Sequence, residues 1–164
     1  MRPLTLAIPK GRISRLLVPL LDRAGIAAAS LLEDDRKLVR LTPDGKMRFL
    51  LLKPDDVPTY VEYGAADLGV VGRDTLLERN YELYQPVDLK VGVCRLVVAG
   101  PRGVPTPALP RVATKYPRIA RQYFASRGVQ AEVIFVQGSV ELAPNVGLSD
   151  LILCLLYTSP SPRD

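Results

Sequence analysis

The sequence of 164 residues contains no histidine, so it lacks the side chain that proteins use most often as a general base and as a metal ligand. Any chemistry of this chain must therefore use arginine, lysine, carboxylates, tyrosine or a bound metal ion. Only two cysteines are present, Cys94 and Cys154, and this number does not favour a disulfide framework. Such cysteine usage is typical of a reducing compartment, and we expect a cytoplasmic protein.

Long apolar runs and blocks of like charge are also missing. No apolar run approaches the roughly 20 residues that a membrane-spanning helix needs, and Met1-Arg2-Pro3 leads into a strand rather than a signal peptide. The net charge is +5, but basic and acidic residues alternate, which does not favour a nucleic-acid groove. Single basic residues at turns fit phosphate recognition. We therefore expect small acidic molecules as partners, and neither nucleic acid nor a membrane.

Two pieces in the second half of the chain place a helix start directly after a strand. Residues 111–117, RVATKYP, read as a short strand that ends at Lys115-Tyr116, and Pro117 follows at the favoured first position of a helix. In residues 137–151, QGSVELAPNVGLSDL, Gly138 permits a turn and Ser139 is a suitable N-cap for a short helix. Helix N-termini in this position form anion or nucleotide sites in α/β proteins.

A strand–helix–strand pattern occurs twice, in residues 49–71 and 132–153, at an offset of 83 residues. The offset aligns Val57 with Val140, Gly64 with Gly147, Asp67 with Asp150, and Leu68 with Leu151. Any two units of this kind share such spacing, so chance similarity stays open as the alternative. The repeat predicts an α/β protein of two lobes with a cleft between them. We expect residues 1–93 in the first lobe and residues 94–153 in the second.

The last eleven residues, CLLYTSPSPRD, break this pattern and become rich in serine and proline. One interpretation is a disordered terminus. The other, which we favour, is that residues 154–164 are a translated adapter of transposon-based sequencing libraries, because the adapter accounts for all of them in frame. On this interpretation the authentic sequence ends near Leu153, the tail has no strand or helix period, and Cys154 and Tyr157 have no functional meaning.

Five segments, in this order and spacing, resemble ATP phosphoribosyltransferase, the enzyme that opens histidine biosynthesis: LTLAIPKGRI, DDRKL, DDVPTYVEYGAADLGVVGRD, RVATKYPRIARQYF and GSVELAPNVGLSDLI. The resemblance covers residues 4–153, and the compact spacing is similar to the short form of the family. It implies the two-lobe architecture of type II periplasmic binding proteins. Short-form members work with a regulatory subunit that resembles a class II aminoacyl-tRNA synthetase, and we also expect a homo-oligomer.

The resemblance implies a transfer reaction in which N1 of ATP attacks the anomeric carbon of phosphoribosyl pyrophosphate. The products are N1-(5-phosphoribosyl)-ATP and pyrophosphate, and substrate-bound Mg²⁺ takes part. Such a reaction suits a chain without histidine, because pyrophosphate leaves readily once arginine, lysine and Mg²⁺ meet its developing charge. No residue of the chain is assigned as a metal ligand.

Arg12 and Arg36 are the candidate catalytic residues, since a guanidinium group matches phosphate oxygens and stays charged. The alternative for Arg36 is a solvated turn residue beside Asp34 and Asp35. The alternative for Arg12 is a surface charge at a helix start, although a cation there opposes the helix dipole and favours a nearby anion.

Binding of phosphoribosyl pyrophosphate is assigned to Lys10, Gly11 and Lys37. Gly11 allows the backbone to approach the ligand closely. The lysines assist the two arginines as further cations in the KGR and DDRKL segments.

Binding of ATP is assigned to residues of both lobes: Asp67, Gly72, Arg73, Tyr116, Ser139 and Glu141. Tyr116 is expected to stack on adenine or to hydrogen-bond to it, with core packing as the alternative. Glu141 has the alternative of favouring the first turn of a helix, and Asp67 that of capping the start of a strand.

The departure from the family pattern is at the end of the chain. Family members continue after the strand that follows Asp150 into a Thr-Gly loop for the 5′-phosphate, and then return to complete the first lobe. Both parts are absent here, so we expect the chain as given to be inactive. The alternative function is a non-catalytic small-anion-binding protein of the same architecture, against which the KGR and DDRKL clusters argue.

Overall fold

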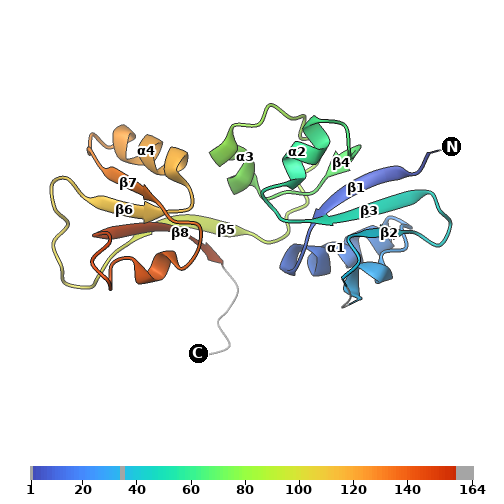
Figure 1. Ribbon diagram of the computed structural model, residues 1–164, viewed down its shortest axis with the longest axis horizontal. Helices are drawn as coiled ribbons and strands as arrows, with labels where there is room; N and C mark the ends of the chain where they lie inside the picture. Colours follow the sequence, from blue (N-terminus) through green and yellow to red (C-terminus); the bar gives the residue numbers. More distant parts are fainter. Residues whose placement is uncertain (1, 34–35, 158–164) are drawn as a thin grey trace. The chain divides into compact units, whose positions relative to one another are not determined.

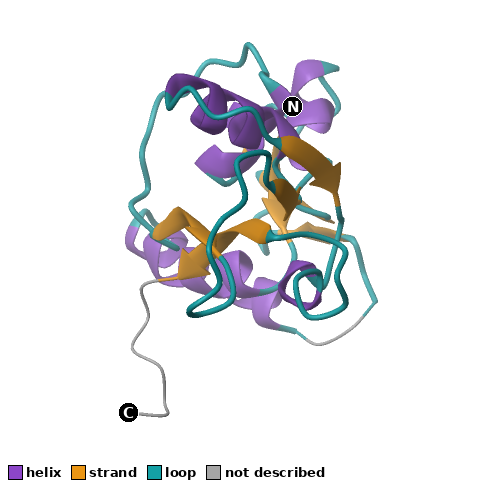
Figure 2. Ribbon diagram, turned by 90° about the vertical axis from the view of Figure 1, so that its left-hand side faces the viewer, coloured by secondary structure: helices purple, strands orange, loops and turns teal. Residues whose placement is uncertain are grey.

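The computed structural model describes residues 2–33 and 36–157, and the chain divides into two compact units, residues 1–92 and 93–164 (Figure 1). Each unit contains one four-stranded sheet. Both helices and strands are present, drawn in purple and orange in Figure 2. The α/β class and the two-part organisation predicted from the sequence are therefore confirmed.

The first unit begins with β1 (Leu4–Pro9), α1 (Arg12–Arg23) and the short 3-10 helix η1 (Ala29–Leu32). It continues with β2 (Val39–Leu41), β3 (Met47–Leu52), α2 (Val57–Glu62), β4 (Leu68–Gly69) and α3 (Arg73–Arg79). The strand order is β2-β3-β1-β4, with β1 parallel to β3 and β4, and β2 antiparallel to β3. The three parallel strands thus end at one edge of the sheet, which we call the carboxyl edge, and start at the opposite amino edge.

Apolar residues on both faces of β1 pack this sheet between helices. Ile8 belongs to the cluster that contains Leu17 of α1 and Phe49 of β3, while Ala7 packs with Val57 of α2. Because neighbouring residues of a strand point to opposite faces, α1 and α2 cover opposite faces of the sheet. Full burial of a side chain such as Phe49 contributes roughly 1.5–3 kcal/mol relative to leaving it exposed.

The second unit contains β5 (Cys94–Ala99), β6 (Arg111–Thr114), α4 (Pro117–Ser126), β7 (Glu132–Phe135), the 3-10 helix η2 (Val140–Leu142) and β8 (Leu151–Tyr157). The strand order is β5-β8-β6-β7, with β6 parallel to β7 and β8, and β5 antiparallel to β8. Val112 packs under α4 with Phe124, whereas Ala113 packs with Val140 of η2. The second sheet is therefore covered on both faces as well.

Proline marks the two long helices differently. Pro117 is the first residue of α4, as the sequence predicts, because its fixed φ suits a helix start and its missing N–H needs no partner there. Pro19 lies inside α1, which nevertheless starts at Arg12 and continues to Arg23. The helix start is therefore not displaced by Pro19.

The end of the described chain differs from the expectation for the tail. β8 does not stop at Leu153 but continues through Tyr157, and its residues pair with β5 from Ala99↔Ile152 to Cys94↔Tyr157. The prediction that the tail has no strand is therefore wrong for its first four residues, Cys154–Tyr157. Two leucines and a tyrosine in succession suit a strand, and within the described part of the chain these four residues pair with β5 alone. The rest of the tail, residues 158–164, lies outside the described residues.

The repeat predicted at an offset of 83 residues is confirmed by the topology. Around the central strand, the first unit has the order β3-β1-β4 and the second has β7-β6-β8, all parallel. The aligned Val57 and Val140 are both buried in their units. The aligned Gly64 and Gly147 have φ of 71° and 74°, the left-handed conformation that ends the helical segment before the third parallel strand.

Candidate functional site

The carboxyl edge of the first unit brings together five of the predicted site residues. Lys10, Gly11 and Arg12 follow β1 directly, and Gly72 with Arg73 follows the neighbouring parallel strand β4 after Val70 and Val71. Ligands of parallel α/β sheets bind outside the carboxyl ends of the strands, where successive turns and helix starts meet. The structure therefore places these two segments on the chemically expected edge of the sheet.

Gly11 occupies a backbone conformation that other residues avoid. Its φ is 97° and its ψ is −130°, and it immediately precedes α1. A Cβ at this position would meet no atom within 4 Å, so the space in front of the backbone is open. The neighbouring Lys10 amide donates to the Leu52 carbonyl at 2.9 Å, which ties the turn to the end of β3. The result is a fixed turn with room for a ligand against its backbone.

Arg36 and Lys37 reach the same edge by a different route. They precede β2, which runs antiparallel to β3, so the start of β2 lies beside the end of β3. The Leu51 amide donates to the Leu38 carbonyl at 2.8 Å and fixes this neighbourhood. Arg36 and Lys37 are both exposed. Asp34 and Asp35, which enter the alternative interpretation of Arg36, lie outside the described residues.

Gly72 and Arg73 form the start of α3. Gly72 is the N-cap residue with extended backbone, and Arg73 is the first helical residue. A Cβ on Gly72 would lie 2.1 Å from the Oδ1 atom of Asp74, so the carboxylate of Asp74 folds back over Gly72. Any side chain at position 72 would displace that carboxylate. The Asp74 side chain can rotate away and the φ of −67° at Gly72 suits any residue, so the local packing alone does not require glycine here.

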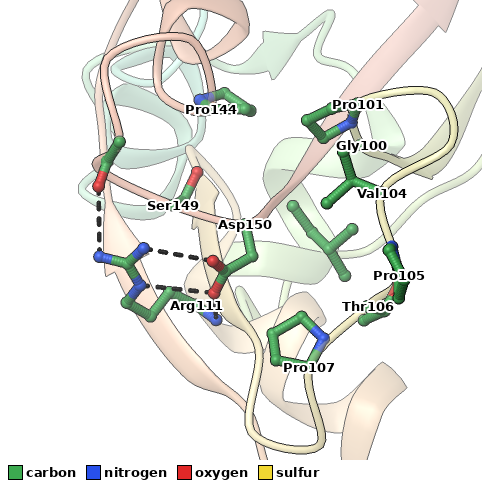
Figure 3. Close-up of a pocket in the computed structure, with 12 residues that line it drawn as sticks. Gly100, Pro101, Val104, Pro105, Thr106, Pro107, Arg111, Pro144, Ser149 and Asp150 are labelled. Carbon is green, nitrogen blue, oxygen red and sulfur yellow. Dashed lines mark hydrogen bonds and ion pairs between the residues drawn. The ribbon is translucent and has the colours of Figure 1, made fainter.

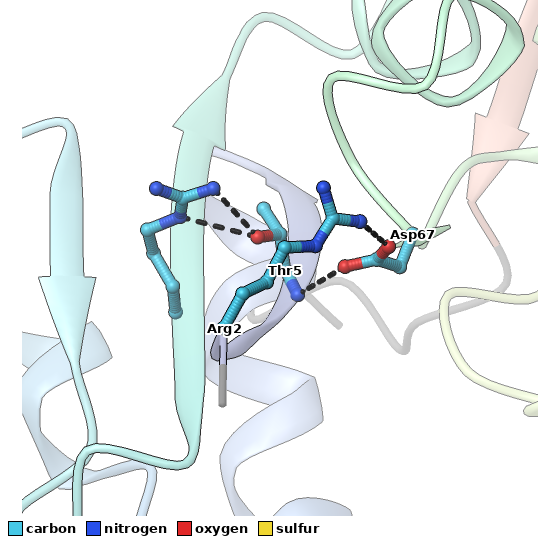
Figure 4. A network of polar contacts seen from close by, with 4 residues as sticks. Arg2, Thr5 and Asp67 are labelled. Atoms are coloured by element: carbon cyan, nitrogen blue, oxygen red, sulfur yellow. Dashed lines mark hydrogen bonds and ion pairs between the residues drawn. The ribbon is translucent and has the colours of Figure 1, made fainter.

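Asp67 does not lie with Gly72 and Arg73, and this corrects its assignment to nucleotide binding. It stands at the amino edge, where one oxygen accepts a hydrogen bond from the Thr5 amide at 2.8 Å and the other pairs with Arg2 (Figure 4). The hydrogen bond from Thr5, and then the charge of Arg2, lower the pKa of Asp67 below its ordinary value of 3.8. The alternative interpretation, a cap at the start of a strand, is the one that the structure supports.

Asp150 likewise caps the start of a strand in the second unit, a role that was not predicted from the sequence. One of its oxygens accepts from the Arg111 amide at 2.8 Å, and the guanidinium of Arg111 donates to both carboxylate oxygens at 3.2 and 3.4 Å (Figure 3). Arg111 also donates to the Gly147 carbonyl at 3.2 Å. These bonds lower the pKa of Asp150 and raise the pKa of Arg111. A signal was present, because the repeat aligned Asp67 with Asp150.

A cavity of about 340 Å³ adjoins this pair in the second unit. Its walls come from the proline-rich connection after β5, including Pro101 and Pro107, and from the loop that contains Pro144 (Figure 3). The cavity opens at the amino edge of the sheet, where Arg111 and Asp150 already satisfy one another. It therefore lies away from the carboxyl edge that carries the predicted site residues.

The carboxyl edge of the second unit holds the three remaining candidates. Tyr116 follows β6, while Ser139 and Glu141 follow β7 at the start of η2. Ser139 and Glu141 are exposed, but only 7% of Tyr116 is exposed, and its ring belongs to the core cluster with Ala120 and Phe124. The structure thus favours the packing alternative for the Tyr116 ring, because a buried ring offers no open face to adenine.

Ser139 occupies the N-cap position of η2, as predicted, but it does not cap through its side chain. Its φ of 50° and ψ of 38° are left-handed, and the side chain makes no capping hydrogen bond. A serine in this region is uncommon and costs conformational energy. Ser139 as a residue is exposed at the carboxyl edge.

Comparison with known proteins decides the family. A protein-family model described as ATP phosphoribosyltransferase (HisG) matches residues 53–160, which is more than half of the chain. The chain is 64% identical over 163 residues to an ATP phosphoribosyltransferase of Sorangium cellulosum, and this match covers 99% of the chain and 77% of the relative. The chain belongs to the ATP phosphoribosyltransferase family. An ATP phosphoribosyltransferase of Halorhodospira halophila is 52% identical over 164 residues, again covering 99% of the chain and 77% of the relative.

A solved structure of this family confirms the fold. The chain resembles the ATP phosphoribosyl transferase (HisG:HisZ) complex from Thermotoga maritima with a TM-score of 0.78 and 39% identity. The similarity covers 94% of this chain and 75% of the solved chain. The resemblance stated from the sequence is therefore confirmed, and the alternative of a non-catalytic anion-binding protein is not favoured.

In residues 2–33 and 36–157 of this ATP phosphoribosyltransferase family member, no group of three or more Cys, Asp or Glu side chains is arranged to hold a metal ion. None of the helices in that part of the chain has the length and apolar character to cross a membrane.

Proposed function

We propose that this chain contributes the catalytic framework of an ATP phosphoribosyltransferase, which joins ATP and phosphoribosyl pyrophosphate in the first step of histidine biosynthesis. The observation that carries the proposal is the convergence of Lys10, Gly11, Arg12 and Lys37 on the carboxyl edge of the first unit. Three of these residues supply backbone or cationic groups after β1, and the fourth approaches beside the end of β3. Membership of the family supports the same reaction.

Pyrophosphate is the group that this edge has to hold. The N1 atom of ATP supplies an electron pair to the anomeric carbon, and the bond from that carbon to the pyrophosphate oxygen breaks. Negative charge therefore grows on the leaving pyrophosphate. Arg12 and Arg36 meet that charge with guanidinium groups, whose geometry matches phosphate oxygens. No proton has to be taken from N1 of adenine, so the lack of histidine is no obstacle.

Phosphoribosyl pyrophosphate is bound, in this proposal, by the turn after β1. The open side of Gly11 lets phosphate oxygens approach the backbone, and Lys10 and Lys37 add positive charge at either side. Mg²⁺ enters with the phosphate groups of the substrates and neutralises part of their charge.

ATP is bound, in this proposal, by the exposed polar groups of the loop after β7. The Ser139 hydroxyl donates a hydrogen bond to an acceptor of the nucleotide, and the Glu141 carboxylate accepts one from a hydroxyl or amino group. Tyr116 contributes through the backbone of its turn, because its ring is buried. In the first unit, Gly72 and Arg73 supply a further turn and a further cation.

We also propose that the protein works in the cytoplasm as a homo-oligomer together with a regulatory subunit. The Thermotoga maritima protein that this chain resembles was solved as a HisG:HisZ complex. A regulatory chain similar to a class II aminoacyl-tRNA synthetase is the partner that the short form of the family implies. Co-purification of the two chains, followed by measurement of their mass ratio in solution, tests this part of the proposal.

The first prediction tests the reaction by release of pyrophosphate from ATP and phosphoribosyl pyrophosphate. We expect release from the enzyme at the full length of its curated relatives, of which this chain spans about three quarters, and none from the 164-residue chain. Arg12→Ala and Arg36→Ala should each lower kcat by about 10²–10³-fold, the usual loss when one transition-state donor is removed.

The matched control is Arg15→Ala, which removes another exposed arginine of α1 one turn beyond the edge. It should leave kcat within about twofold, because solvent screens a charge that does not touch the substrate. Arginine variants that raise only KM would contradict the leaving-group role, and a full-length enzyme that releases no pyrophosphate would overturn the proposed function itself.

A further inference from the structure

Thr114 is a fully buried polar residue at the centre of the carboxyl edge of the second unit. It is the last residue of β6, its relative exposure is 0%, and it pairs in register with Phe135 of β7 on one side and Leu153 of β8 on the other. A buried hydroxyl in this position requires hydrogen-bond partners, because an unsatisfied buried polar group destabilises the folded state. The hydrogen-bond partners of the Thr114 hydroxyl show which segments it connects.

The Thr114 hydroxyl forms two hydrogen bonds of opposite direction. It donates to the Leu153 carbonyl of β8 at 2.7 Å and accepts from the Tyr116 amide at 2.9 Å. The carbonyl of Thr114 accepts from the Val136 amide at 3.0 Å, directly after β7. One residue therefore connects the ends of three parallel strands, including the two turns that lead to Tyr116 and to Ser139.

The first unit shows that this hydroxyl is not a requirement of the fold. The register Ala7↔Gly69 in the first unit corresponds to Ala113↔Ile152 in the second, so Ile8 is the counterpart of Thr114. An isoleucine at this position fills the core but forms no hydrogen bond through its side chain. In the first unit, the turn after β1 is held instead by the hydrogen bond that the Lys10 amide donates to the Leu52 carbonyl.

We propose that Thr114 is a positioning residue for ATP binding, because its hydroxyl fixes the backbone of the turn at Tyr116 against β8. Its carbonyl, which any residue would supply, bonds the start of the loop that carries Ser139 and Glu141. The proposal rests on the proposed function. Its physical basis is that threonine has a stiff χ1 angle and combines a donor and an acceptor in one atom. With that atom in place, the turn after β6 cannot move independently of β8. A displacement of about 1 Å in a binding segment is enough to weaken catalysis severely.

The second prediction compares three variants of the enzyme at the full length of its relatives, with ATP and phosphoribosyl pyrophosphate as the measured ligands. Thr114→Val keeps the shape and removes the hydroxyl, and it should raise KM for ATP about tenfold while KM for phosphoribosyl pyrophosphate changes less than about twofold. Thr114→Ser restores the hydroxyl and should bring KM for ATP back to within about threefold. Val112→Ala is the matched control, because it truncates a fully buried residue of the same strand but leaves both hydrogen bonds of the Thr114 hydroxyl in place.

A second measurement does not depend on activity. Amide hydrogen exchange at Tyr116 should be at least about tenfold faster in Thr114→Val than in Val112→Ala, because only the first variant removes the acceptor of that amide. Equal exchange in the two variants, or a rise of KM for both substrates in parallel, would overturn the proposal. Failure of the proposed function would show itself elsewhere, in an unsubstituted enzyme that releases no pyrophosphate.

Discussion

The two units of this protein share one topology but use its two edges differently. At the amino edge they are nearly identical, since Asp67 and Asp150 each accept from the backbone amide of the central strand at 2.8 Å. Each aspartate also donates its own amide back to the same residue, Thr5 or Arg111, at 2.9 Å. The reciprocal pair fixes the register between the first and third parallel strands of both units.

At the carboxyl edge the units diverge. The first unit has a glycine turn with open space and exposed lysine and arginine side chains. The second has a turn held by the buried Thr114 hydroxyl, a buried tyrosine ring and a proline at the helix start. Identical residues at corresponding positions of the repeat therefore mark the scaffold, while the differing residues mark the chemistry.

The two units also differ along the outer side of the third parallel strand, the side that faces away from the central strand. In the second unit β8 is a seven-residue strand that is covered along its side by antiparallel β5. In the first unit β4 has two exposed residues, and within the described residues it pairs with β1 alone. An open strand edge presents unpaired backbone groups to any chain that can add a strand.

The largest effect on stability is predicted for the tyrosine that distinguishes the second edge. Tyr116→Ala should lower the free energy of unfolding by about 3–5 kcal/mol, the range for removing a large buried ring. Phe124→Ala is the matched control, because Phe124 is also 7% exposed and belongs to the same cluster on α4. Urea unfolding should give losses of similar size for both variants.

ATP affinity separates packing from a direct contact in the same two variants. If the ring only packs, titration with ATP should give equal changes for Tyr116→Ala and Phe124→Ala at a temperature where both remain folded. A selective loss of ATP affinity in Tyr116→Ala would restore the adenine contact that the sequence suggested. It would also show that the second edge opens when the nucleotide binds.

The comparison also explains what the sequence could and could not predict. Pro117 and Gly11 were identifiable because proline and glycine restrict or extend backbone conformation locally, so their positions carry structural meaning without tertiary information. The placement of Asp67 was wrong because its partner, Thr5, lies 62 residues away in the chain. Sequence spacing alone does not show which end of a two-residue strand faces the ligand edge.

The same limit applies to Tyr116 and Thr114. A tyrosine after a strand suits either a binding site or a core, and only the packing of α4 against β6 decided between them. The hydrogen bonds of Thr114 depend on the register between β6 and β8. Register follows from the whole buried face of a sheet and not from a single segment.

A smaller effect is predicted for the glycine that distinguishes the first edge. Gly11→Ala should destabilise the protein by about 1–3 kcal/mol, because φ of 97° with ψ of −130° is strained for a residue with a Cβ. It should also raise KM for phosphoribosyl pyrophosphate, since the new methyl group occupies the open space before the turn. Gly25→Ala is the control, because Gly25 has φ of 76° and equally open surroundings at the far end of α1. Gly25→Ala should lose stability in thermal unfolding but keep its KM, and an equal rise of KM in both variants would contradict a ligand site at Gly11.

The smallest effect on stability is predicted for the amino edge, where the two units have the same aspartate contacts. The pKa of Asp67 is lowered chiefly by the hydrogen bond from the Thr5 amide, and the pKa of Asp150 chiefly by the hydrogen bond from the Arg111 side chain. A carboxyl group whose pKa is lower in the folded state contributes stability that is complete above its unfolded value of roughly 3.9 and is lost as the pH falls through the folded value.

Asp67→Asn and Asp150→Asn should therefore each lower the midpoint of thermal unfolding at pH 7, and the difference from the unsubstituted protein should shrink progressively below about pH 4. Arg2→Ala should have less effect than Asp67→Asn, because it removes only the more exposed partner and leaves the Thr5 amide bonded to Asp67. Added salt should weaken the contribution of Arg2 more than that of the amide, since mobile ions screen exposed charge pairs. Variants that remain equally destabilised at pH 3 and pH 7 would show that shape, rather than the charge of the two aspartates, holds the starts of the strands together.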